Sequence, residues 1–149
     1  PDAPDQRTSD HGWDLRLDGP RLRPIIADLR DRGIRVSLFM DPDPTTVGAA
    51  AGVGADRIEI YTEPYAEAFG TTNQEAMTEA CAACADEAKR AGLGVNAGHD
   101  LNLENLPTLC HRVSNLLEVS IGHALVADAL EFGLPATVKA YLEALAPSH

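Results

Sequence analysis

The segment DRIEIYT, residues 56–62, gives the clearest indication of the fold. Ile58 and Ile60 alternate with Glu59, so in a strand the two isoleucines face one side and the carboxylate faces the other. A carboxylate is rarely buried without a partner. Glu59 is therefore easier to place inside a barrel whose helices lie outside than in a sheet with helices on both faces.

Three further apolar runs predict strands, and the segments between them predict helices. The runs are IRVSLFM (34–40), LGVNAG (93–98) and EVSIG (118–122). The clearest helix follows Asn73 as its N-cap and ends before Gly92. Further helices are expected over residues 20–32, 124–132 and 135–144. Strands that alternate with helices form a parallel sheet, because parallel strands need a crossover between them.

Each predicted strand carries, at or just after its carboxyl end, residues that chemistry can use. They are Asp41 and Asp43, Glu59 and Thr62, Asn96 and His99, and Gly122 and His123. In a (β/α)₈ barrel this is the face on which active sites are built. We therefore predict an α/β fold in which residues 1–149 form the C-terminal half of a single (β/α)₈ TIM barrel, about the last four βα units plus extra helices. A small open α/β sheet is the alternative.

Length and composition limit the class of protein. A TIM barrel takes about 250 residues, so we expect the first four βα units to precede residue 1. The chain carries 23 acidic and 12 basic residues, a net charge of −11, which argues against nucleic-acid and anionic-membrane partners. No apolar run approaches the roughly 18 residues of a membrane helix. Three sparse cysteines favour a reducing, cytoplasmic location.

Five segments carry a family resemblance: TSDHGWDL (8–15), RVSLFMDPD (35–43), GADRIEIYTEPYA (54–66), GLGVNAGHDLNLENL (92–106) and EVSIGHALVADAL (118–130). Together they resemble the C-terminal part of the pyridoxine 5′-phosphate synthase family. The resemblance implies a (β/α)₈ barrel that works in vitamin B6 biosynthesis as a transferase-type synthase. That enzyme condenses 1-deoxy-D-xylulose 5-phosphate with 3-amino-2-oxopropyl phosphate, closes the pyridine ring and releases inorganic phosphate and water. The resemblance also implies no metal, no organic cofactor and a homo-octamer.

The resemblance assigns roles to six residues. His99 in NAGH resembles the proton donor, and Glu59 in IEIYT resembles a carboxylate that stabilises the transition state. The implied substrate contacts are Thr8 to the sugar phosphate, and the Asp100 backbone, Gly122 and His123 to 3-amino-2-oxopropyl phosphate. The family's first strands, with a His and a Glu that act as bases and two Arg contacts, have no counterpart here. We therefore expect this chain alone to be incomplete and inactive.

The residue types fit this chemistry without the resemblance. Ring closure needs several proton transfers near neutral pH, for which histidine is the natural group. Gly122 and His123 precede a predicted helix whose first-turn amides suit a phosphate. Plainer roles stay open: a loop histidine at position 99, a Glu59 carboxylate satisfied by an arginine or an amide, and a Gly122 that only turns the chain.

Other features receive simpler predictions. Residues 1–18 are expected to form an active-site loop over bound substrate, although packing explains Trp13 equally well. Asp41 and Asp43 are expected to cap the next helix. Cys81 and Cys84 form a CxxC in the middle of a helix, which indicates small core residues rather than a metal or redox site.

Two other functions remain. One is a non-catalytic phosphate-binding half-barrel that needs a partner chain or an N-terminal half. The other is a Schiff-base aldolase, which would need a lysine on a strand. Neither Lys89 nor Lys139 is on a predicted strand, so the aldolase is disfavoured.

Overall fold

Four parallel strands in the order β1-β2-β3-β4 form the sheet. The computed structural model describes residues 1–2, 5–6 and 8–146. Its elements in chain order are α1 (Leu15–Asp31), β1 (Ser37–Met40), α2 (Pro44–Val53), β2 (Arg57–Tyr61), α3 (Glu63–Ala68), α4 (Gln74–Arg90), β3 (Gly94–Gly98), α5 (Leu106–Arg112), β4 (Leu116–Ser120), α6 (His123–Phe132) and α7 (Leu134–Ala144). The predicted parallel α/β fold is confirmed, and closure into an eight-stranded barrel stays a prediction.

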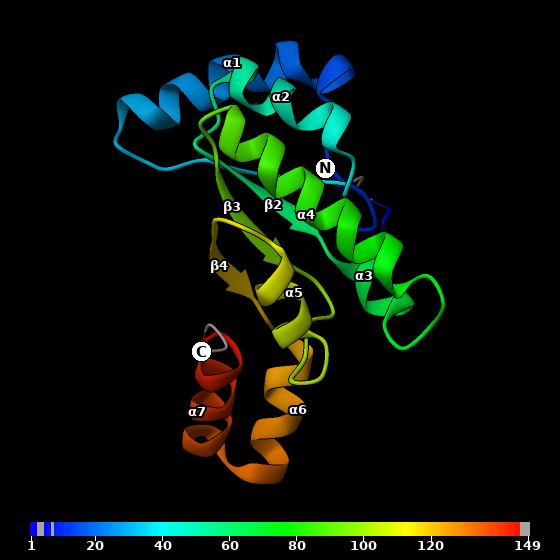
Figure 1. Cartoon of the computed structure of the whole chain (residues 1–149). Helices are drawn as coiled ribbons and strands as arrows, with labels where there is room; N and C mark the ends of the chain where they lie inside the picture. Colours follow the sequence, from blue (N-terminus) through cyan, green and yellow to red (C-terminus); the bar gives the residue numbers. More distant parts are fainter. Residues whose placement is uncertain (3–4, 7, 147–149) are drawn as a thin grey trace.

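The strand register sorts side chains onto two faces. Leu38, Ile58 and Val95 lie in register and are buried, and α2 and α4 cover this face (Figure 1). On the opposite face Phe39, Glu59, Asn96 and Glu118 form one cross-strand row. The prediction that Glu59 faces away from the isoleucines is therefore confirmed.

The helix ends follow local capping chemistry. Helix α1 begins at Leu15, because the Asp14 side chain accepts a hydrogen bond from the Arg16 amide. The expected start at residue 20 was wrong, because Pro20 lies inside α1 and is not its first residue. Helix α4 follows Asn73 as expected.

The two aspartates after β1 differ in role. Asp43 caps α2 by accepting from the Thr45 amide at 2.9 Å, as predicted. Asp41 does not cap the helix. It accepts a hydrogen bond of 2.8 Å from the Gly12 amide and so holds the N-terminal segment against the end of β1. The capping prediction for Asp41 was therefore wrong, because its partner lies 29 residues earlier in the chain.

Helices α6 and α7 form a hairpin beyond β4 (Figure 1). The hairpin leaves large apolar side chains exposed, among them Leu130 at 86% and Leu142 at 63%. Of the described helices, none combines the length and apolarity that crossing a membrane requires.

Candidate active site

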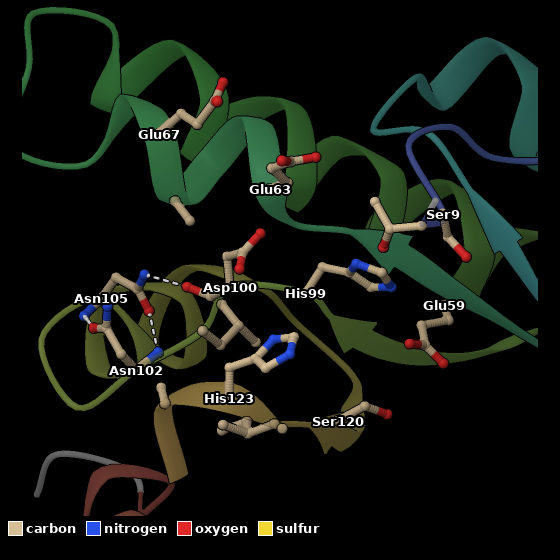
Figure 2. Close-up of a pocket in the computed structure, with 16 residues that line it drawn as sticks. Ser9, Glu59, Glu63, Glu67, His99, Asp100, Asn102, Asn105, Ser120 and His123 are labelled. Atoms are coloured by element: carbon tan, nitrogen blue, oxygen red, sulfur yellow. Dashed lines mark hydrogen bonds between the residues drawn. The ribbon is translucent and has the colours of Figure 1, made fainter. Parts of the chain in front are cut away.

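A cavity of about 1240 Å³ opens at the carboxyl ends of β2, β3 and β4. Its lining includes all six residues that the sequence nominated: Thr8, Glu59, His99, Asp100, Gly122 and His123. Figure 2 shows the side chains of Glu59, His99 and His123 around one space. The structure therefore brings these residues together at the carboxyl ends of the strands, and their chemical roles stay predictions.

The turn after β3 carries His99 into the cavity in an unusual backbone conformation. His99 has φ of 86° and Asp100 has φ of 55°, a left-handed region that residues with side chains rarely adopt. The His99 imidazole packs against two aromatic rings, with its centroid 4.9 Å from that of Phe39 and 5.4 Å from that of Tyr61. These two rings restrict where the imidazole can point.

Glu59 is half-buried and lies beside the same turn. A Cβ added to Gly98 would overlap Oε1 of Glu59, so the carboxylate occupies the space above that glycine. Burial raises the pKa of Glu59 above its ordinary value of 4.5, while the nearby His99 favours the ionised form and Glu118 opposes it. Glu59 and His99 are thus electrostatically coupled.

The arginines on the open face bind other partners than Glu59. Arg57 donates to Oδ1 of Asn96 at 2.9 Å and to Oε2 of Glu118 at 3.0 Å. Arg35 also reaches Glu118, at 3.2 Å. Among the described residues the Glu59 carboxylate has neither a hydrogen bond nor an ion pair. The plainer role left open for Glu59, a carboxylate satisfied by an arginine or an amide, therefore does not apply among the described residues.

The turn into α6 brings backbone amides to the cavity. Gly122 is the N-cap of α6, and the cavity lining continues through His123 and Ala124. The first amides of a helix have no partner within it and carry partial positive charge, so they favour an anion. Gly122 has φ of −107°, and a Cβ there would have no neighbour within 4 Å. Neither crowding nor a left-handed backbone requires glycine at this turn.

The N-terminal segment reaches the cavity only in part. Thr8 and Ser9 line it, and the Trp13 amide donates to the Phe39 carbonyl at 2.9 Å. Trp13 packs against the core and, like His11, is absent from the described lining. The expected loop over residues 1–18 was therefore wrong at its C-terminal boundary, because helix α1 already starts at Leu15. Residues 3–4 and 7 of that range, and 147–149 of the expected domain, lie outside the described residues.

Six further polar residues line the cavity, and the sequence pattern did not predict them as site residues. These are Ser9, Glu63, Glu67, Asn102, Asn105 and Ser120. Their common signal is position, since most follow or end a strand at the same edge of the sheet. The described lining contains four carboxylates and neither lysine nor arginine, so it is acidic away from the α6 amides. Among the described residues, no three His, Cys, Asp or Glu side chains are placed so that they could hold a metal ion together.

Cys81 and Cys84 lie in the hydrophobic core with 0% exposure. Burial raises the pKa of each thiol to about 12, which keeps both protonated near neutral pH. The prediction that they are core residues is confirmed.

The model of one protein family, described as pyridoxal phosphate biosynthesis protein PdxJ, matches residues 1–147. The chain belongs to the PdxJ family. Pyridoxine 5′-phosphate synthase from Albidiferax ferrireducens is 56% identical over 146 residues, which cover 98% of this chain and 58% of that protein. The enzyme of the same name from Brucella anthropi is 48% identical over 151 residues, which cover 98% of this chain and 60% of that protein. The chain thus spans about three fifths of the length of these PdxJ relatives.

A solved structure also aligns with this PdxJ chain. It is a chain of the Amycolatopsis orientalis BexX/CysO complex, with a TM-score of 0.49 and 18% sequence identity. The alignment covers 89% of this chain and 54% of that one.

Proposed function

We propose that this chain forms part of the active site of a pyridoxine 5′-phosphate synthase, which condenses 1-deoxy-D-xylulose 5-phosphate with 3-amino-2-oxopropyl phosphate. The observation that carries the proposal is the convergence of Thr8, Glu59, His99, Asp100 and the Gly122–His123 turn on one cavity. Family membership supports it independently.

His99 acts as proton donor in this proposal, and Glu59 stabilises positive charge that develops in the transition state. The electrostatic coupling between the two groups supports these roles. Dehydration and ring closure need a group that gains and loses protons near neutral pH, as an imidazole does. A partly desolvated carboxylate interacts more strongly with a nearby cation than one in bulk water.

The substrate phosphates need a separate source of positive potential. The α6 amides at Gly122 and His123, with the Asp100 backbone, hold the phosphate of 3-amino-2-oxopropyl phosphate, while Thr8 contacts that of the sugar. The described lining offers neither lysine nor arginine, so in this proposal groups outside that lining balance the remaining phosphate charge.

The same proposal covers the assembly. The chain supplies the last four βα units of a (β/α)₈ barrel, and its length agrees with a part of such an enzyme, since it covers about three fifths of each relative. The complete enzyme works as a homo-octamer in the cytoplasm and releases inorganic phosphate as a product. It acts without metal or organic cofactor.

The test compares His99→Ala with His111→Ala in the protein as encoded, with any residues that flank these 149. His111 is an exposed histidine in the last turn of α5 and serves as the matched control. We expect His99→Ala to lower the rate of pyridoxine 5′-phosphate formation by about 10²–10⁴-fold and His111→Ala to leave it unchanged.

Two results would contradict the proposal. Equal turnover of the two variants would remove the proton-donor role of His99. Wild-type protein that binds inorganic phosphate but makes no product from the two substrates would favour the non-catalytic phosphate-binding half-barrel.

A further inference from the structure

The turn that carries His99 is held in a conformation that its own residues disfavour. His99 and Asp100 are consecutive, both have positive φ and neither is glycine. A left-handed residue with a side chain is costly, so two in succession persist only where surrounding contacts fix them. Contacts with two neighbouring helix ends supply this restraint.

Thr62 holds the start of the turn. It is the N-cap of α3, a position where a threonine hydroxyl usually bonds to an amide of its own helix. Here the hydroxyl makes no such cap bond. Its single proton lies between two acceptors instead, the carbonyl oxygens of Gly98 at 2.5 Å and His99 at 2.7 Å. The side chain is 0% exposed, so water does not compete for these bonds.

Asn105 holds the other side of the turn in the same manner. It is the N-cap of α5 and also makes no side-chain cap bond. Its Nδ2 donates to the Asp100 carbonyl at 3.0 Å, and its Oδ1 accepts from the Asn102 amide at 2.9 Å. The Tyr65 hydroxyl donates to the Asn105 backbone carbonyl at 2.6 Å and so anchors this residue to α3.

We infer that Thr62 and Asn105 are positioning residues, which use the side chains of two helix N-caps to lock the His99–Asp100 turn in its left-handed conformation. The role of His99 as proton donor in this inference rests on the proposed function. Proton transfer requires the donor within hydrogen-bond reach of its target, and a displacement of about 1 Å can cost about 10²-fold in rate. The two side chains thus act on the reaction through the turn.

The experiment uses three variants and one matched control in the protein as encoded. Thr62→Val keeps the shape of the side chain and removes the hydroxyl, and Thr62→Ser keeps the hydroxyl. Asn105→Asp keeps the shape and removes the donor to Asp100, so it tests the inference from the other side if Thr62→Val does not fold. Thr78→Val is the control, because Thr78 is 1% exposed and its hydroxyl donates to the Gln74 carbonyl at 2.7 Å inside α4.

The first readout needs no substrate. NMR order parameters of residues 99–101 should fall in Thr62→Val and Asn105→Asp, and remain at the wild-type level in Thr62→Ser and Thr78→Val. Because this measurement is made on ligand-free protein, it judges the lock even if the wild type proves not to be the proposed synthase. An ordered turn with unchanged chemical shifts in both Thr62→Val and Asn105→Asp would overturn the inference.

The second readout is steady-state turnover of the two proposed substrates. We expect kcat to fall at least tenfold in Thr62→Val and Asn105→Asp, with KM changed less than threefold. Thr62→Ser should recover most of the wild-type kcat, and Thr78→Val should match the wild type. A kcat in Thr62→Val equal to that in Thr78→Val would also overturn the inference. Wild-type protein without turnover would refute the proposed function and leave the order parameters to decide whether the lock exists.

Discussion

The carboxylate of Glu59 lies over the Cα of Gly98, in space that any side chain at position 98 would occupy. The two residues come from neighbouring strands and are close because β2 and β3 pair in parallel register. Ser120 of β4 closes the other side, since its Cβ would be 3.2 Å from a Cβ at position 98. The glycine at the end of β3 therefore determines where the carboxylate can sit.

Gly98→Ala should displace the Glu59 carboxylate and lower kcat by about 10²-fold, the cost expected of a misplaced group. The fold should survive, because Gly98 does not have positive φ and the obstructing atoms belong largely to a side chain. Steady-state kinetics with far-UV circular dichroism checks both parts. Gly52→Ala in α2 is the control, because a Cβ there meets nothing within 4 Å. Equal kcat values for the two variants would refute this account.

Glu59→Gln should make the protein more stable at pH 7 but not at pH 4. Burial raises the pKa of Glu59 above 4.5, so the folded state favours the protonated form. The stability that this form provides is complete below the unfolded pKa and is lost as pH rises through the folded pKa. Glutamine does not ionise and avoids this loss. Urea unfolding at the two pH values measures the difference, with the exposed Glu131→Gln as control. A stability gain that is equal at both pH values would contradict the assignment.

Glu118→Gln should move the acidic limb of the pH–kcat profile to lower pH. The negative charge of Glu118 raises the pKa of Glu59, and its removal also frees Arg57 and Arg35, whose positive charge favours the ionised carboxylate. Glu75→Gln breaks a comparable Glu–Arg pair, with Arg112, and provides the control. An acidic limb that stays in place, or moves to higher pH, would show that Glu118 does not influence Glu59.

Gly122→Leu should raise the KM for 3-amino-2-oxopropyl phosphate roughly tenfold or more, the equivalent of one lost hydrogen bond to a charged group. Stability should change little, because a Cβ at position 122 has no neighbour within 4 Å. The side chain would enter the space beside the α6 amides instead. Steady-state kinetics and thermal unfolding measure the two effects. An unchanged KM would remove the α6 amides from the phosphate site.

Much of the site followed from local sequence pattern. The alternation of Ile58, Glu59 and Ile60 placed the carboxylate on the open face, because side chains on a strand alternate strictly between its faces. The position of His99 after β3 and of Gly122 before α6 followed from the ends of the apolar runs. Parallel strands share one carboxyl edge, so these residues had to lie near each other.

The rest depends on contacts that no local pattern encodes. Gly98 lies next to Glu59 only because of the β2–β3 register. Asp41 accepts a hydrogen bond from the amide of Gly12, which lies 29 positions away in the chain. The hydroxyl of Thr62 bonds to backbone carbonyls 36 and 37 positions later in the chain, although its place before α3 predicts that it would cap that helix.

The two left-handed residues after β3 have a consequence for how the protein responds to heat. The contacts of Thr62 and Asn105 offset the intrinsic cost of these two residues, so once those contacts loosen the turn opens more readily than the strands behind it. Warming should therefore abolish catalytic competence while the sheet is still intact, and cooling should restore it without a refolding step. For this protein a melting temperature would overstate the range in which it works.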